Sequence, residues 1–363
     1  MKYIKYIKFI KNNRFIDFLK NYMYCVYMKD YIIRKIINKN NKKYEYYKVI
    51  NEEINNKINN KIILNKIDKI YIPPAYIDVK IFLNKELLAT GIDTAGRKQY
   101  IYSENRKKKR ELKKYNQIYK LSKNIYKLKK KINKDLNHKD FDKNKLIALT
   151  LKIMDLCNFR GGNKKYEELY GTYGLTTIHK KHVKISKNEI IIEFIGKKGV
   201  NNNCIIKNKS LQKIIKNIYQ ISSKNDNYLF SIIYKNEKIG ITILDLNKYL
   251  ESFNVTCKDL RTWNANIIFL KNFKNEVDHL DNSYDSKDEN KKLKLRKKII
   301  RNAIKSTAIS LHHTPVICKN SYIFKKIIED IEKNDLVINK MRKKNIINYE
   351  KLLEDFLKKN YLE

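Results

Sequence analysis

A strongly apolar segment, residues 145–159, limits the fold of this chain more than any other feature. In a chain whose residues are 33% charged, this segment carries apolar side chains at most positions. Its length and density favour a buried helix over a strand, and Asn158 to Gly162 mark the helix end, since glycine is typical there. Arg160 is therefore expected where a buried element holds its guanidinium rigidly, as phosphate binding requires. A surface arginine that caps helix carbonyls is the alternative.

The net charge narrows the classes of partner. Lysine and arginine number 80 against 38 acidic residues among 363, which gives a formal net charge of +42. This charge is far larger than solubility needs. It indicates a polyanionic partner such as DNA, RNA or an anionic membrane. The competing explanation is the compositional bias of an AT-rich genome, which would raise lysine, asparagine, isoleucine and tyrosine together.

Cysteine usage and hydropathy argue against several classes of protein. The five cysteines are scattered and form no Cys-x-x-Cys pair, so the sequence predicts neither a zinc site nor a disulfide framework, and favours a reducing compartment. Polar residues interrupt every apolar run before ~18 positions, and no signal peptide is recognisable. We therefore expect no membrane contact and no secretion signal. The cysteines are Cys25, Cys157, Cys204, Cys257 and Cys318.

The N-terminal part predicts two regions. Residues 1–43 are basic and aromatic, and predict a helical or partly ordered extension of open role. Residues 44–106 predict a small, mainly β domain, because a proline turn leads into strands of alternating residues. A glycine turn and the polar strand after it suit a nucleic-acid contact, and an ordinary solvated hairpin is an equal alternative. The candidate contact residues are Lys98, Gln99, Tyr100 and Tyr102.

Residues 107–363 predict a mostly α-helical domain with a three-stranded sheet, so the whole chain is expected to be α+β. A basic helix from about residue 105 leads into this domain. A hairpin over residues 183–195 and a third strand near Cys204 form the expected sheet, with Lys197 at its flexible tip between two glycines. Residues 272–292 are polar and of mixed charge, and are expected to be a loop insertion.

The segment from Ser310 to Tyr322 organises the candidate chemistry. His313 stands nine positions before Tyr322, with a Thr-Pro break between them. Alone the pattern is weak, because a tyrosine is usually a packing residue and the chain holds 27 of them. Together with Arg160, Lys197 and Arg261, however, these two residues form the set that breaks a phosphodiester without a metal. A tyrosine nucleophile needs cationic donors and a proton donor for that reaction.

Several phrases of the sequence carry a family resemblance. From Ile72 to about Lys325 the chain resembles the small type IB DNA topoisomerases of poxviruses, giant viruses and bacteria. The order and spacing of the phrases agree with the family over most of the chain. They are Ile72-Pro73-Pro74-Ala75-Tyr76-Ile77-Asp78-Val79, Ala89-Thr90-Gly91 with Asp93, Gly96-Arg97-Lys98-Gln99-Tyr100, Arg160 with Gly162-Asn163 and Tyr166, Tyr173-Gly174-Leu175-Thr176-Thr177, Phe194 with Gly196-Lys197, Lys258-Asp259-Leu260-Arg261-Thr262-Trp263, Thr314-Pro315, Cys318-Lys319 and Ser321-Tyr322-Ile323.

The resemblance implies a role for each candidate. Tyr322 would be the nucleophile that becomes joined to a DNA 3′-phosphate, and Arg160 and Arg261 would hold the non-bridging oxygens. Lys197 would protonate the leaving 5′-oxygen, and His313 would donate to a non-bridging oxygen. Residue 312 is histidine where the family usually has glycine, so the backbone before His313 is expected to differ.

The implied activity is relaxation of supercoiled duplex DNA through transient single-strand cleavage, strand rotation and religation. The phosphotyrosyl ester keeps the bond energy, so neither ATP, a metal nor another cofactor is expected. The implied partner is double-stranded DNA, bound by a monomer. Such an enzyme, an isomerase, would act where DNA is replicated or transcribed, and in the virion and host cytoplasm if it is viral.

Three other functions remain open at this point, of which a membrane-surface role for residues 1–43 is the least favoured. A tyrosine recombinase shares the catalytic set, but commonly carries histidine at the position of Lys258, which is a further candidate for DNA contact here. A non-enzymatic packaging protein would rest on charge alone, and Tyr322→Phe would then change nothing.

Overall fold

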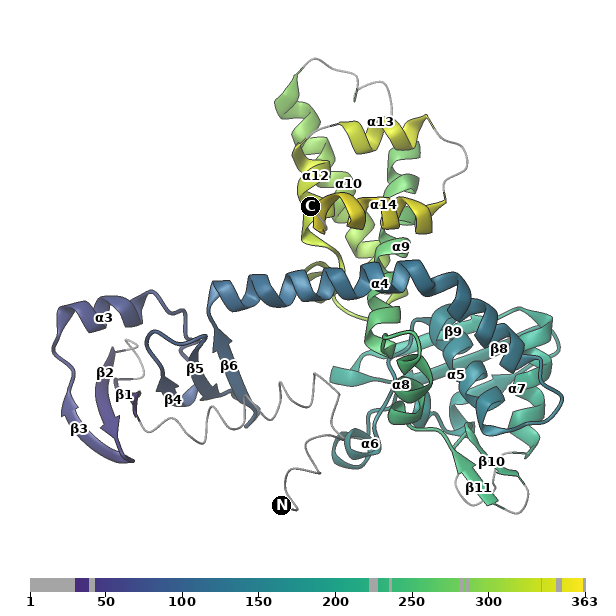
Figure 1. Cartoon of the computed structure of the whole chain (residues 1–363), viewed down its shortest axis with the longest axis horizontal. Coiled ribbons are helices and arrows are strands. Elements are labelled where there is room, and N and C mark those ends of the chain that lie inside the picture. Colours follow the sequence, from purple (N-terminus) through teal and green to yellow (C-terminus); the bar gives the residue numbers. More distant parts are fainter. Residues whose placement is uncertain are drawn as a thin grey trace. The chain divides into compact units, whose positions relative to one another are not determined.

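The computed structural model of this protein describes residues 30–38, 43–221, 228–234, 237–280, 284, 288–333, 335–343 and 348–361. The chain is α+β, as the sequence predicts (Figure 1). It divides into two compact units, Met1–Leu112 and Lys113–Glu363. Over the described ranges, no helix is both long and apolar enough to cross a bilayer.

An antiparallel sheet forms the centre of the first unit. Its six described strands lie in the order β3-β2-β1-β4-β5-β6. Alternate residues face inward, so that Val79, Ile81 and Ala89 join Ile67 in one buried cluster. Ile67 comes from α3 (Lys61–Asp68), which begins where the Asn60 side chain accepts two backbone N–H groups. The strands are β1 (Asp30–Asn38), β2 (Lys43–Ile50), β3 (Glu53–Lys57), β4 (Ile77–Ile81), β5 (Leu87–Ile92) and β6 (Lys98–Tyr102).

Strand β1 corrects the prediction of a helical extension over residues 1–43. It pairs with β2 and β4, so that Ile32 lies opposite both Lys48 and Ile81 and is buried in the sheet core. Pairing with strands far along the chain outweighs the local helical tendency of this lysine-rich segment. Residues 1–29 and 39–42 lie outside the described residues.

The basic helix expected after the first sheet is α4 (Glu104–Leu136). Within the second unit its buried residues recur at three- and four-residue steps, from Tyr115 through Ile118 and Leu121 to Leu136. The lysines between them stay on the opposite face.

The second unit opens with a buried helix and a small sheet. Helix α5 (Lys143–Cys157) buries ten of its residues, as its apolar density predicts. Strands β7 (Val183–Ile185), β8 (Ile190–Ile195) and β9 (Asn201–Ile206) form the expected three-stranded sheet. Helix α6 (Lys164–Tyr170) precedes this sheet, and α7 (Lys209–Ile221) follows it. Strands β10 (Ser231–Tyr234) and β11 (Glu237–Gly240) make a further hairpin.

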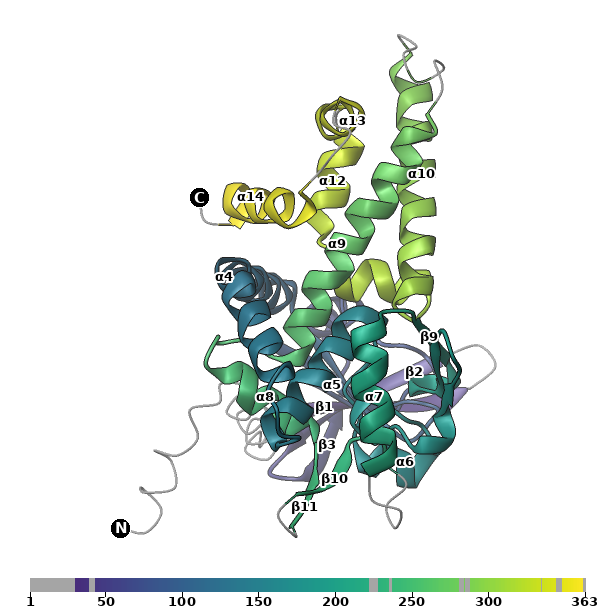
Figure 2. The same ribbon diagram turned by 90° about the vertical axis from the view of Figure 1, so that its right-hand side faces the viewer.

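Two long helices and several shorter ones make up the rest of the second unit. Helices α9 (Cys257–Asp278) and α10 (Glu289–Ser310) run side by side as a long hairpin (Figure 2). The predicted loop over residues 272–292 is therefore wrong for residues 272–278 and 289–292, where buried Phe273 and Val277 continue the apolar face of α9. The remaining helices are α8 (Ile243–Glu251), α12 (Lys325–Lys333), α13 (Leu336–Arg342) and α14 (Tyr349–Tyr361).

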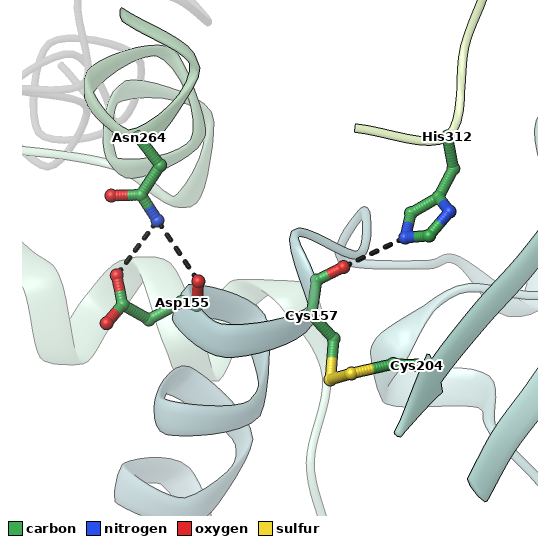
Figure 3. The surroundings of a disulfide bond; sticks show 5 residues. All are labelled: Asp155, Cys157, Cys204, Asn264 and His312. Carbon is green, nitrogen blue, oxygen red and sulfur yellow. Dashed lines mark hydrogen bonds between the residues drawn. A yellow bond between two sulfur atoms is a disulfide. The ribbon is translucent and has the colours of Figure 1, made fainter. Parts of the chain in front are cut away.

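A disulfide between Cys157 and Cys204 corrects the prediction that the cysteines form no such bond (Figure 3). It links the last residue of α5 to β9, across 47 residues of sequence. The two positions belong to different elements, so their spacing in the sequence carries no signature. Cys257 and Cys318 are free and buried.

Candidate active site

The backbone around Arg160 is held on two sides. Helix α5 ends at Asn158 in the left-handed conformation, which turns the chain toward Arg160. The carbonyls of Arg160 and Gly161 then accept the backbone N–H groups of Leu175 and Thr176, at 2.8 and 2.6 Å. Gly162 is at φ +101°, and a Cβ there would lie 2.9 Å from the Gly174 backbone. Only glycine permits this close approach. The contact between Gly162 and Gly174 therefore fixes the backbone next to Arg160.

Arg261 projects from the first turns of α9. Thr256 caps this helix by accepting the N–H of Asp259, and the Asp259 carboxylate accepts the Thr256 N–H and hydroxyl. The side chain of Arg261 is only 5% exposed. A capped, buried helix end therefore fixes this guanidinium in place.

Tyr322 ends an unusual helical segment. Thr314 caps α11 (Pro315–Ile317), with Pro315 at the first helical position, and a π-helical turn over Cys318–Tyr322 follows. Such turns are rare and often occur at functional sites. The buried Asn266 of α9 then accepts the Phe324 N–H at 2.9 Å and donates to the Tyr322 carbonyl at 3.0 Å. Asn266 thus fixes the backbone on both sides of Tyr322.

Four of the five candidate catalytic residues meet in the second unit. The rings of His313 and Tyr322 stack, with centroids 4.9 Å apart and an interplanar angle of 15°. Arg261 Nε donates to the Tyr322 hydroxyl at 3.3 Å. A second nitrogen of Arg261 donates to the Leu311 carbonyl, and Arg160 donates to the next carbonyl, that of His312, at 3.4 Å. Both guanidiniums therefore meet consecutive carbonyls of the chain segment that carries His313.

Several buried polar atoms of this cluster have no partner among the described residues. They are Arg261 Nη1 and both ring nitrogens of His313. A buried unsatisfied group costs about 1–3 kcal/mol, and such groups are rare in folded proteins. Beside a tyrosine hydroxyl, these atoms are suited to bind an anion.

The charges of the cluster act on one another. Burial alone would raise the pKa of Tyr322, but Arg261 and Arg160 together outweigh it and lower that pKa. Burial, with the same two arginines, lowers the pKa of His313 to about 4, so the ring is neutral near pH 7. Burial also lowers the pKa of Arg261, to about 10, which leaves the guanidinium charged. The two arginines thus form a cationic cluster that makes ionisation of Tyr322 easier than for an ordinary tyrosine.

Among the described residues, no contact joins Lys197 to the other four candidates. It is exposed on the turn between β8 and β9, and the structure gives it no hydrogen bond or ion pair with a described residue. Two backbone hydrogen bonds close this turn: the Gly196 N–H donates to the Val200 carbonyl, and the Gly199 N–H donates to the Gly196 carbonyl. A Cβ at Gly196 would lie 2.4 Å from the Asn202 side chain, which explains the glycine before Lys197.

The candidates for DNA contact on β6 divide between the two faces of the strand. Tyr100 and Tyr102 stack with ring centroids 6.4 Å apart, and the Lys98 ammonium lies 5.8 Å from the Tyr100 ring. Gln99 has the opposite orientation and donates to Asp93 at 2.8 Å. In the second unit, the exposed Lys258 lies one turn before Arg261 on α9. The sequence reasoning missed Asn266, because an asparagine inside a helix carries no pattern.

Comparison with known proteins decides the family. The catalytic core of eukaryotic DNA topoisomerase I matches residues 103–348. A DNA topoisomerase 1B of Acanthamoeba polyphaga mimivirus is 34% identical over 80% of this chain and 84% of its own length. The chain belongs to the type IB DNA topoisomerase family. The family is one of isomerases, so the predicted family and enzyme class are confirmed.

Other relatives of this topoisomerase family member are also viral. The DNA topoisomerase 1B of vaccinia virus (strain Copenhagen) is 30% identical over 68% of the chain and 73% of its own length. A solved XerH site-specific recombinase bound to a palindromic difH substrate covers 66% of this chain and 58% of its own, at 13% identity and a TM-score of 0.35. With so low a TM-score, this similarity neither supports nor opposes the recombinase alternative.

Proposed function

We propose that this protein relaxes supercoiled duplex DNA by breaking and rejoining one strand through a 3′-phosphotyrosyl intermediate. The observation that carries the proposal is the contact between Arg261 and the Tyr322 hydroxyl, beside buried polar atoms that have no partner among the described residues. A phosphodiester fits this arrangement, because Tyr322 could displace one of its ester oxygens while the donors bind its two non-bridging oxygens, which share one negative charge. Family membership supports the same reading.

In the proposed cleavage step, the Tyr322 phenolate attacks the phosphorus and the bond to the 5′-oxygen breaks. The two arginines stabilise the charge that develops on the non-bridging oxygens, and each such donor is worth ~10²–10³ in rate. Neutral His313 donates one hydrogen bond to the same oxygens. The phenolic proton leaves to solvent, which the lowered pKa of Tyr322 favours.

Lys197 is the proposed general acid. It gives a proton to the leaving 5′-oxygen, so that no bare alkoxide is expelled. Its exposed position on a firmly closed turn supports this role, because a duplex can reach an exposed ammonium. Religation reverses the step: the 5′-hydroxyl attacks, Lys197 regains its proton and Tyr322 leaves. Between the two steps, the free end rotates.

The remaining proposals concern DNA contact. We assign DNA binding by the first unit to residues 44–106 and β1, with Lys98, Tyr100 and Tyr102 on one face of β6, and assign the chemistry to residues 107–363. Gln99 is a weaker candidate, since Asp93 already binds it. Lys258 would contact the phosphate backbone near Arg261. Four of the five catalytic candidates meet within a single chain, which supports action as a monomer. We place this action at sites of DNA replication or transcription.

A plasmid assay tests the proposal. Wild type and Tyr322→Phe are incubated with negatively supercoiled plasmid in EDTA without ATP, and the products are run in SDS to detect protein joined to DNA. We expect relaxation and a 3′-linked adduct with wild type, and neither with the variant. DNA binding without relaxation or adduct in either protein would contradict the proposal. Strand exchange between two paired sites would instead favour a recombinase.

A further inference from the structure

Helix α10 ends in a turn that normally takes glycine. The His312 N–H donates to the Ile309 carbonyl at 3.0 Å, and the His313 N–H donates to the Ala308 carbonyl at 3.1 Å. This pair of bonds closes a helix through one residue in the left-handed conformation, for which glycine is favoured. Here that residue is His312, at φ 51°. A side chain with a Cβ is strained in this conformation, so the histidine needs an explanation.

The His312 ring makes a contact that glycine could not make. Its Nε2 lies 3.0 Å from the Cys157 carbonyl (Figure 3). A carbonyl only accepts, so Nε2 carries the proton and donates. The ring also packs on Phe159, with centroids 5.3 Å apart. Cys157 is itself joined to β9 through Cys204. The ring therefore connects the end of α10 to the end of α5, at Cys157, three residues before Arg160.

The backbone of the same turn meets the two arginines. The carbonyls of Leu311 and His312 accept from Arg261 and Arg160, respectively. Both carbonyls depend on the left-handed turn at His312 for their direction. Arg160, which follows α5, thus donates to the backbone of His312, and the His312 ring in turn bonds to Cys157 at the end of α5.

We propose that His312 is a positioning residue for Arg160 and Arg261. Its ring holds the left-handed turn against Cys157, and the turn presents two consecutive carbonyls that aim the guanidiniums at the reacting phosphate. This inference rests on the proposed phosphodiester cleavage. It adds a residue of this chain that acts through the arginines without touching the DNA.

Three substitutions at position 312 separate the ring contact from the turn. His312→Gly permits the left-handed backbone and removes the contact. His312→Asn also tolerates this conformation, but its amide ends at the place of Nδ1 and falls short of the Cys157 carbonyl. His312→Gln is longer, and its amide nitrogen can take the place of Nε2. The glutamine variant should therefore restore what the asparagine variant loses.

The measurement is the single-turnover rate of adduct formation on a DNA duplex with enzyme in excess. We expect His312→Asn and His312→Gly to react about tenfold more slowly, which corresponds to about 1.4 kcal/mol, and His312→Gln to recover most of the rate. The dissociation constant for DNA should stay within about twofold of wild type, since positioning of the arginines affects the transition state more than binding. In an Arg160→Ala background, His312→Asn should have a smaller effect than in wild type, because one of the two guanidiniums that the turn positions is gone.

The control is His279→Asn, which makes the same change at the C-terminal cap of α9. There, the side chain of the exposed His279 is hydrogen-bonded to Asn275 of its own helix and to no other described residue. It should leave the rate unchanged. Equal rates for His312→Asn, His312→Gln and wild type would overturn the inference, as would an undiminished effect of His312→Asn in the Arg160→Ala background. A wild-type protein that forms no adduct would instead refute the proposed function.

Discussion

Replacing Asn266 by alanine should destabilise the second unit and slow cleavage together. The Asn266 side chain is fully buried and makes three hydrogen bonds, to the Thr262 carbonyl, the Tyr322 carbonyl and the Phe324 N–H. Alanine leaves the last two groups without this partner inside the protein. At about 1–3 kcal/mol for each of these two buried unsatisfied groups, the loss in free energy of unfolding should be about 2–6 kcal/mol.

The expected loss of activity follows from the same contacts. Without Asn266, the backbone on both sides of Tyr322 is free to shift, and a displacement of about 1 Å can lower a rate ~10²-fold. We expect the rate of adduct formation to fall by about that factor, with DNA affinity nearly unchanged. Urea unfolding followed by fluorescence of Trp263, which is buried in the same helix, reports the stability of this unit.

Asn264→Ala provides the matched control. Asn264 lies on the same helix in a half-buried position, and its amide donates to Asp155 at 2.8 Å (Figure 3). Loss of a surface contact usually changes stability by less than about 0.5 kcal/mol, and Asn264 does not contact Tyr322. If both variants lost the same stability and the same cleavage rate, the proposed role of Asn266 would be refuted.

Three further predictions concern charge. The pKa of His313 falls from its ordinary 6.5 to about 4 on folding, so its contribution to stability is full above pH ~6.5 and is lost as the pH falls through about 4. When the pH is lowered from 7 to 4, the free energy of unfolding should therefore fall by up to ~3 kcal/mol less in His313→Gln than in wild type. Urea unfolding at the two pH values measures this difference. Lys197→Ala should cleave DNA much more slowly than wild type. The defect should disappear on a substrate whose leaving 5′-oxygen is replaced by sulfur, because a thiolate leaves without being protonated. A defect that persists on this substrate would contradict the general-acid role. If ~8 phosphates are contacted, log affinity for DNA should fall with log salt at a slope near ~−7, and a slope near zero would contradict backbone binding.

The sequence identified those elements whose signal is local. The apolar density of α5 and the alternation in β8 predict burial directly, because each element buries one side against a core. The strand β1 was missed, since its place depends on partners at β2 and β4 that are distant in the sequence. The disulfide escaped for the same reason: Cys157 and Cys204 meet only after α5 and β9 have packed.

The candidate site divides in the same way. Tyr322, His313 and the arginines carry chemistry in their side chains, so residue type and family phrasing could select them. The support of the site is carried by groups that every residue has, the carbonyls of Leu311 and His312, and by the amide of Asn266 inside a helix. The direction of the two carbonyls depends on the backbone φ of His312. The sequence revealed that His312 replaces the usual glycine, but whether the turn would keep its left-handed shape depended on a bond to Cys157, 155 residues away. A histidine at that position has physical meaning only once its partner is known, because strain that a contact offsets cannot be told from strain that changes the fold.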